Sequence, residues 1–199
     1  MEFGSVAAPA SAEVEQETVE RAQRGDQQAL ADIYDWYLPR IYRYVLARVG
    51  NVTEAEDLTE DIFLRMLGAI AGYRMRNIPF SAWLFRIAHN HVVSYFRKSG
   101  ARGVPGILDE GIADARPDPA SMVETRLTVE EVVRATRDLP EAQREVIALR
   151  FAVGLSIAET AQVLGKREGN VKALQHKAVV RLQRALAVKP ERWAAEGLG

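Results

Sequence analysis

The chain contains no cysteine. Disulfides, thiolate metal ligands and a thiol nucleophile are therefore excluded, which suits a reducing cytoplasm. No apolar run approaches the roughly 18 residues that a membrane helix needs, and no signal peptide is visible. We therefore expect a cytoplasmic protein without membrane insertion.

Histidine is also scarce, with three residues in the chain. His89 and His91 stand two apart on a predicted helix, so their side chains point in different directions and cannot readily share a metal. The acidic residues from Glu54 to Asp61 are accompanied by no nucleophile, glycine-rich phosphate loop or metal cluster. The sequence therefore predicts no metal, no cofactor, no small-molecule substrate and no enzyme activity.

Strand signals are weak, because the chain shows no sustained alternation and no Asn-Gly hairpin turn. Helical patterns fill most of the sequence and predict an all-α fold, with two small helical domains joined by a flexible linker. A capping box of Thr53 and Glu56 is expected to start one helix, and Asp26 to cap another. The predicted segments are a cloning scar and lead-in at 1–12, a first domain at 13–100, a linker at 101–121, a second domain at 122–187 and a tail at 188–199.

Charge is strongly segregated, although the net charge is only -1. Residues 73–102 hold six bases and no acid, and residues 155–199 hold eight bases and four acids. Residues 1–72 hold 13 acids and six bases, and the linker region is acidic as well. Two separate basic segments indicate two surfaces that face a polyanion.

The second domain has the spacing of a helix-turn-helix. Ala161 lets two helices cross closely, Gly165 permits a sharp left-handed turn, and Val171 fills the inner face of the second helix. Ile157, Leu164 and Leu174 are expected to complete this small core. The second helix should begin near Arg167 and present polar side chains to duplex DNA. The candidate contacts are Lys166, Arg167, Asn170, Lys172, Gln175 and Lys177.

The first domain mixes aromatic residues with bases between Tyr73 and Lys98. A basic helix face beside a loop can capture single-stranded DNA, because phosphates need cations and unstacked bases need a pocket or a π-face. Phe80, Trp83, Leu84 and Ile87 are interpreted as core residues. The candidate contacts are Tyr73, Arg74, Arg76, Asn77, Arg86, Asn90, Ser94 and Arg97. Tyr73 could equally be a core residue.

Three stretches resemble sigma factors of bacterial RNA polymerase. Ala55–Arg65 is similar to their polymerase-binding helix, Phe80–Asn90 to the next stretch of the same domain, and Leu139–Phe151 with Gly154–Ser156 to the start of their promoter-reading domain. The similarity covers about 170 residues in the correct order. Because no domain separates the two blocks, the chain resembles the extracytoplasmic-function subgroup.

The resemblance implies a sigma region 2 domain at 13–100 and a region 4 domain at 122–187. Asp57, Leu58, Asp61 and Phe63 would dock on the β′ clamp coiled coil of core polymerase, and region 4 on the β flap. The loop from Gly72 to Ile78 and Asn90 would read the minus-ten element as a single strand, and the helix from Arg167 to Lys177 the duplex minus-thirty-five element. An anti-sigma factor is an expected further partner.

The chain departs from the family pattern at Glu60, Leu67, Arg167, Asn170 and Leu174, so promoter sequence cannot be transferred from relatives. A stand-alone helix-turn-helix regulator that binds duplex DNA as a dimer is the main alternative. It leaves the acidic helix and the basic loop-helix without a role. A nucleic-acid-processing enzyme is a second alternative, which lacks a catalytic constellation.

Overall fold

The computed structural model describes residues 11–74, 78–99 and 135–187. Within these ranges the regular structure is entirely helical, which confirms the all-α prediction. The linker at 101–121, Arg76 and Asn77 lie outside the described residues.

Helices α1 (Ala12–Gln23) and α2 (Gln27–Val49) form a tight pair at the beginning of the chain. Asp26 caps α2 as expected, because its carboxylate accepts hydrogen bonds from the backbone N–H groups of Gln28 and Ala29. Gly25, with a φ of 87°, turns the chain between the two helices. Helix α2 runs through Pro39 without interruption and ends at Gly50 in the left-handed conformation.

Helix α3 (Val52–Ala69) begins earlier than the sequence predicted. Its cap is Asn51, whose side chain accepts from the N–H of Glu54, so the expected Thr53–Glu56 capping box is wrong. Asn51 precedes Thr53 and has the extended backbone that a cap needs. A short turn, η1 (Ile70–Gly72), and α4 (Phe80–Ser99) follow.

The second helical group contains α6 (Glu141–Ile147), a π-helical turn η2 (Ala148–Ala152), α7 (Ile157–Leu164) and α8 (Glu168–Ala187). Ser156 caps α7 in a capping box with Glu159, which the sequence analysis did not identify. Gly165 ends α7 with a φ of 61°, as the helix-turn-helix pattern predicted.

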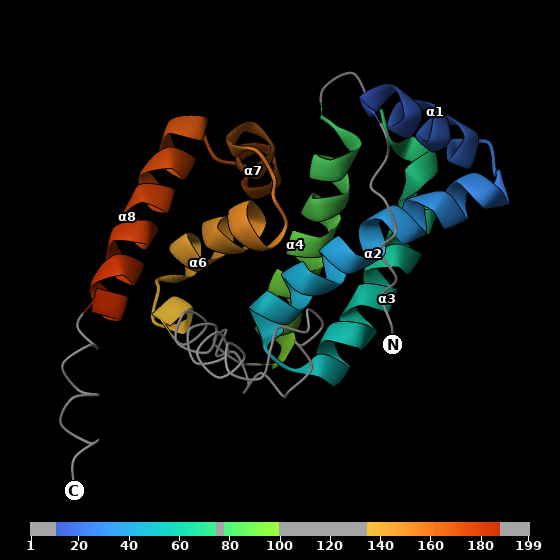
Figure 1. The fold of residues 1–199 in the computed structure, drawn as a ribbon. Helices are drawn as coiled ribbons and strands as arrows, with labels where there is room; N and C mark the ends of the chain where they lie inside the picture. Colours follow the sequence, from blue (N-terminus) through green and yellow to red (C-terminus); the bar gives the residue numbers. More distant parts are fainter. Residues whose placement is uncertain (1–10, 75–77, 100–134, 188–199) are drawn as a thin grey trace, which may run out of the picture.

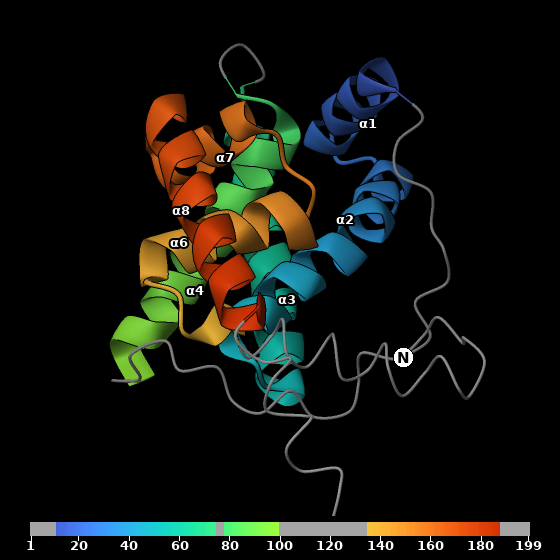
Figure 2. The ribbon, with the colours of Figure 1, turned by 60° about the vertical axis from the view of Figure 1, so that its left-hand side comes forward.

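The two groups lie against each other, with α6, η2 and α7 beside α2 and α4 (Figures 1 and 2). One continuous core crosses the boundary and includes Phe85 of α4, Leu149 of η2 and Leu155. Helix α4 is therefore covered both by its own domain and by the second group. Phe85 and Ala88, which were not among the predicted core residues of α4, are fully buried, and the ring of Phe85 packs against Tyr37 and Tyr44 of α2.

Candidate nucleic-acid and partner interfaces

The helix-turn-helix has the small core that its spacing predicts. Val146, Ala161 and Val171 form a buried cluster, and partly buried Ile157, Leu164 and Leu174 pack against it. The turn is held by the N–H of Lys166, which donates to the carbonyl of Ala161 at 2.9 Å. Because Val171 is fully buried, the orientation of α8 about its axis is fixed.

Most of the predicted minus-thirty-five contacts are solvent-exposed, in the turn before α8 and along its first half: Lys166, Arg167, Asn170, Lys172 and Lys177. Gln175 is different, because it is only partly exposed and its Oε1 accepts from Nε of Arg150 at 3.0 Å. Gln175 therefore helps to hold η2 against α8. Lysine and arginine around an exposed helix face match the demands of duplex DNA.

Sequence reasoning missed the middle of the exposed face of α8. Gly169, Ala173 and His176 are all exposed and follow one another at spacings of four and three, opposite buried Val171 and Ala178. The helical periodicity indicates this face, although none of the three residues is a lysine or an arginine. Gly169 and Ala173 are small enough to allow close approach to a groove, and an alanine methyl can contact a thymine methyl.

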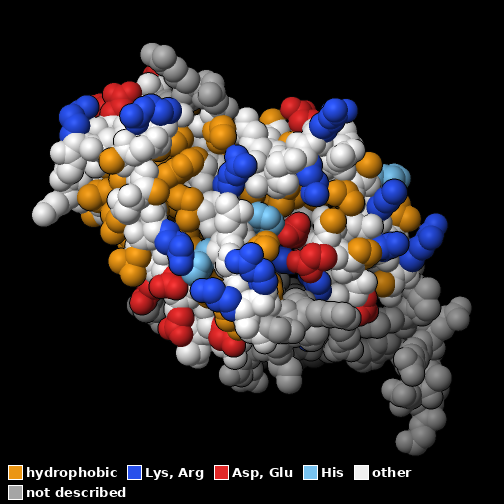
Figure 3. All heavy atoms as spheres, turned by 180° about the vertical axis from the view of Figure 1, so that it is seen from behind, with side chains coloured by type: hydrophobic (Ala, Val, Ile, Leu, Met, Phe, Trp, Pro, Cys, Tyr) orange, Lys and Arg blue, Asp and Glu red, His pale blue; other side chains and the backbone are white. Residues whose placement is uncertain are grey.

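The predicted polar face of α4 is largely available to solvent. Arg86, Asn90 and Arg97 are exposed, and Ser94 is half-buried. Basic side chains are spread from the middle of the molecule toward α8 when it is seen from behind (Figure 3). The structure thus leaves this face available for a polyanion.

Tyr73 and Arg74 stand at the described start of the basic loop. Tyr73 is only 5% exposed, and its ring packs against Phe80 and Trp83. Its hydroxyl donates to the carbonyl of Ile78 at 2.7 Å, so the side chain closes the base of the loop. The burial of Tyr73 favours a core role for it over a DNA contact, whereas Arg74 is exposed.

The predicted polymerase-binding residues of α3 divide into two sets. Asp57 and Asp61 are exposed, whereas Leu58 and Phe63 are about 95% buried in the first domain. The apolar side chains that α3 does expose are Leu64, at 65%, and Leu67, at 46%. The acidic and apolar surface of α3 is therefore formed by Asp57, Asp61, Leu64 and Leu67, together with Glu60.

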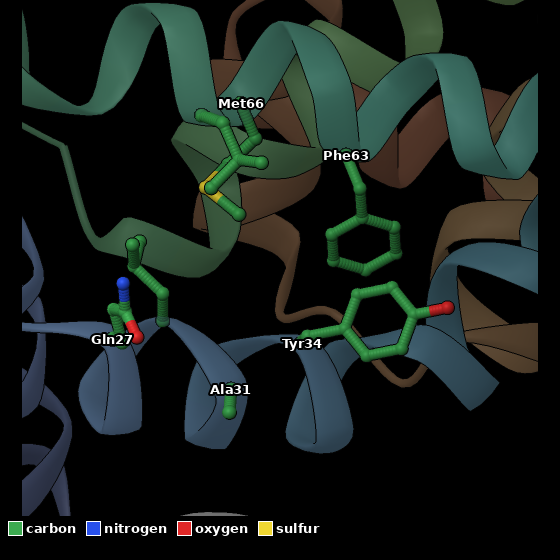
Figure 4. A pocket seen from close by; sticks show the side chains of 7 residues that line it. Gln27, Ala31, Tyr34, Phe63 and Met66 are labelled. Carbon is green, nitrogen blue, oxygen red and sulfur yellow. The ribbon is translucent and has the colours of Figure 1, made fainter.

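An apolar groove of about 320 Å³ lies beside this surface, between α2 and α3. Tyr34 and Phe63 form one wall, with ring centroids 4.6 Å apart, and Met66 lies farther along (Figure 4). Phe63 therefore borders the groove although little of it reaches solvent. Hydrophobic side chains also gather over the α3 side of the molecule in Figure 3.

A charged cluster joins the two domains. Arg48 of α2 is 1% exposed and donates to the carboxylate of Glu141 in α6, with Glu145 at 3.9 Å. Burial opposes ionisation of Glu141, but Arg48 and Arg144 outweigh it and lower its pKa. Burial raises the pKa of Glu145 despite Arg48. A second link is the hydrogen bond from Ser81 of α4 to Glu159 of α7, at 2.5 Å.

His89 and His91 face different neighbours, as expected from their spacing. Nδ1 of His89 lies 3.3 Å from the hydroxyl of Tyr44 and 3.6 Å from Glu145, whereas Nε2 of His91 lies 3.2 Å from Asp61. Burial and the charge of Arg48 lower the pKa of His89 to about 4. Its imidazole is therefore neutral at pH 7, and its contact with Glu145 is not an ion pair.

No group of three or more His, Cys, Asp or Glu side chains in the described residues could hold a metal ion. None of the helices formed by these residues is long and apolar enough to span a bilayer.

Comparison with known proteins identifies both helical groups. The family model of Sigma-70 region 2 matches residues 33–102, and that of Sigma-70 region 4 matches residues 130–186. The chain is 42% identical over 173 residues to the ECF RNA polymerase sigma factor BldN of Streptomyces coelicolor, covering 85% of this chain and 65% of BldN. It is 35% identical to SigD of Mycobacterium tuberculosis, covering 83% of this chain and 80% of SigD.

A solved structure extends the likeness to the fold. The sigma factor RpoE of Bartonella quintana, in complex with the anti-sigma factor NepR, matches with a TM-score of 0.64 and 26% identity. The match covers 80% of this chain and 97% of RpoE. The chain belongs to the extracytoplasmic-function sigma factors, which regulate transcription and are not a family of enzymes.

Proposed function

We propose that this chain brings core RNA polymerase to promoters through three separate surfaces: α3, α4 with the loop before it, and the beginning of α8. The observation that carries the proposal is the exposure pattern of the helix-turn-helix. Val171 is fully buried while Lys166, Arg167, Asn170 and Lys172 are exposed. The apolar residue that the helix-turn-helix needs in its core is buried, and the polar and basic residues suited to DNA contact face solvent.

Polymerase would dock on the acidic and apolar surface of α3. Asp57 and Asp61 supply negative charge, Leu64 supplies an exposed apolar anchor, and the neighbouring groove can accept further apolar side chains. Interfaces combine such an anchor with a charged rim, where the rim mainly governs orientation and encounter rate. The β′ clamp coiled coil is the partner proposed for this surface, and the β flap for the second domain.

The two DNA elements would be read in different forms. The beginning of α8 would enter the major groove of the duplex minus-thirty-five element, with cations on phosphates and polar side chains on base edges. Arg74, Arg86, Asn90, Ser94 and Arg97 would contact the non-template strand of the minus-ten element after it becomes single-stranded. This activity places the protein in the cytoplasm with the chromosome.

An anti-sigma factor is the proposed regulator. RpoE, which shares this fold, is known in complex with the anti-sigma factor NepR. The exposed apolar surface around Leu64 and the groove beside it give such a protein a place to compete with polymerase. Competition would appear as loss of core binding when the regulator is added.

Run-off transcription with purified core polymerase on a library of promoter fragments tests the proposal. The chain should produce transcripts from a defined subset of fragments, and core polymerase alone should not. A stand-alone regulator would instead bind promoter duplexes tightly without polymerase and yield no new transcript. Transcripts that do not depend on the chain would contradict the proposed function.

A further inference from the structure

Gln23, the last residue of α1, connects this helix to the start of the basic loop. Its side-chain amide nitrogen donates to the carbonyls of Ile70 and Tyr73, both at 2.8 Å, although these residues follow 47 and 50 positions later. An amide NH₂ has two protons, so both bonds form at once. One side chain therefore ties α1 to both ends of the turn η1.

Tyr73 links the start of the loop to Ile78 at its other end. Its backbone N–H donates to the carbonyl of Ile70 at 3.0 Å, and its buried hydroxyl donates to the carbonyl of Ile78 at 2.7 Å. Burial and nearby Glu15 raise the pKa of Tyr73 to about 12, so the hydroxyl remains a donor at neutral pH. Tyr73 is thus hydrogen-bonded to Gln23 through its backbone carbonyl and to Ile78 through its hydroxyl.

Arg74 shares one acceptor with Gln23. Its guanidinium donates to the carbonyl of Tyr73 at 3.0 Å and to that of Ala71 at 3.1 Å. The carbonyl of Tyr73 therefore accepts two hydrogen bonds, one from the uncharged amide of Gln23 in α1 and one from the guanidinium of Arg74 in the loop. A shift of this carbonyl moves Arg74, one of the cations proposed to contact the minus-ten strand.

Helix α1 is itself held firmly. Val19 and Ala22 are buried, and the hydroxyl of Tyr37 in α2 donates to the carboxylate of Glu15. Gln23 is therefore presented by a fixed element, which is what a supporting residue requires. All of α1 precedes the residues matched by the region 2 family model, which begin at residue 33.

We propose that Gln23 is a positioning residue for minus-ten recognition, and that α1 belongs to the recognition machinery through it. The inference rests on the proposed function of the basic loop and α4. Reading a base edge depends on placing donors and acceptors closely, and each well-placed contact discriminates by about fivefold to a hundredfold. Without the Gln23 donor, Ile70 and Tyr73 each lose a hydrogen bond, and the start of the loop shifts relative to α4.

The test measures strand preference by the complete holoenzyme. The probes are two fluorescent single-stranded oligonucleotides: the non-template minus-ten strand of the library promoter with the strongest transcript, and a scrambled version of it. The variant Gln23→Glu keeps the side-chain length but cannot donate as a carboxylate, and Gln23→Ala removes the group. Gln16→Ala is the matched control, because Gln16 is exposed on the same helix and bonds Glu20 within it.

Both Gln23 variants should lower the ratio of the two affinities about tenfold, while Gln16→Ala preserves it. The ratio does not depend on how much protein is folded. Equal weakening of both probes would therefore show a structural role only and overturn the inference, as would an unchanged ratio. If the wild-type holoenzyme shows no preference at all, the proposed reading of the minus-ten strand by the basic loop and α4 fails.

Discussion

Arg48 and Glu141 form an ion pair across the two domains, 93 residues apart in the sequence. Arg48 is buried while Glu141 is about half exposed, so the two partners bear unequal desolvation costs. Together with Glu145 and His89 they lie where α2, α4 and α6 meet (Figure 1). Separating the domains would expose the buried guanidinium to water.

The first prediction concerns this ion pair. Arg48→Met should weaken domain association by about 3 kcal/mol, the lower end of the range for breaking a buried pair, because Glu141 already reaches solvent. Small-angle scattering should show a larger radius of gyration, and chemical denaturation a lower stability. Arg43→Met is the control, since Arg43 is exposed on the same helix and bonds the carbonyl of Pro39. Unchanged scattering from Arg48→Met would contradict the prediction.

Separation of the domains is also expected on a promoter. Elements centred about 25 base pairs apart lie about 85 Å apart along B-DNA. In the structure, Lys166 in the turn of the helix-turn-helix lies close enough to His89 of α4 to lower its pKa. Under the proposed function, the packed arrangement would not present both reading surfaces to their elements at once, so Arg48→Met should not reduce transcription.

The second prediction is a pH dependence centred on His89. Its folded-state pKa of about 4 lies below the ordinary 6.5, so it favours folding above pH 6.5 and loses this contribution as pH falls toward 4. The loss can reach about 3 kcal/mol for a shift of this size. Denaturation of wild type and His89→Gln across this range should give a stability difference that varies with pH.

Glu145 acts in the opposite direction in the same window. Its pKa is raised by burial, so its contribution is present below the ordinary value near 4.5 and is lost as pH rises through the raised value. Glu145 therefore offsets part of the pH dependence that His89 gives the wild-type protein. His91, whose pKa is also lowered, adds to the pH dependence from His89. A pH-independent difference between wild type and His89→Gln would refute the assignment to His89.

The sequence predicted the helix-turn-helix well because its determinants are local. Ala161, Gly165 and Val171 act within one supersecondary unit, and the left-handed turn at Gly165 follows from residue type and spacing. The Arg48–Glu141 pair could not be predicted in this way, since no periodicity links residues that meet only after the domains pack. The placement of Asn51 rather than Thr53 as a cap reflects competition between neighbouring residues that can both cap.

The predicted polymerase-binding residues of α3 show a second limit of prediction from sequence. Resemblance assigned Asp57, Leu58, Asp61 and Phe63 to one motif, but a motif does not state which side chains face outward. Leu58 and Phe63 pack inside the domain, and Leu64 is the exposed apolar residue. Helical spacing alone places residues 58 and 62 on one face and residues 57, 61 and 64 on another.

The third prediction separates docking from folding on α3. Leu64→Asp should reduce binding to core polymerase by 2 kcal/mol or about thirtyfold, because it places a charge at a desolvated anchor while leaving the domain folded. Leu58→Asp should instead lower thermal stability, since it buries a charge in the core. Pull-downs and circular dichroism on both variants test this. Full polymerase binding by Leu64→Asp would remove α3 from the interface.

The fourth prediction concerns the exposed face of α8. Lys172→Ala should weaken promoter binding, and the salt dependence identifies its contact: a phosphate contact flattens the salt slope by about one unit and affects all sequences equally. Ala173→Glu should abolish minus-thirty-five recognition, because a carboxylate at the middle of this face meets the phosphates. Holoenzyme binding to wild-type and mutated minus-thirty-five duplexes, at several salt concentrations, measures both effects.

The exposed end of the same helix supplies a control for these variants. Arg184 is exposed near the C-terminus of α8, away from the turn at Gly165, so Arg184→Ala should have a smaller effect than Lys172→Ala. Equal losses from the two substitutions would indicate a general charge effect. That result would place the reading surface elsewhere than at the beginning of α8.

The fifth prediction concerns Asn90. It is exposed on α4 between Arg86 and Arg97, and its amide can both donate to and accept from a base edge. Asn90→Ala should leave polymerase binding intact but reduce formation of the open complex, because extruding a base costs a few kcal/mol that specific contacts must offset. Permanganate footprinting of the promoter measures strand opening directly. The control is Gln28→Ala, which removes an exposed amide that bonds Asp32 within α2.

A promoter with a premelted bubble then separates melting from recognition. If Asn90 contributes only to melting, the bubble should restore transcription to the wild-type level. If Asn90 reads a base, the defect should persist on the bubble and should depend on which base stands at the contacted position. Normal strand opening by Asn90→Ala on the closed promoter would show that neither role belongs to this residue.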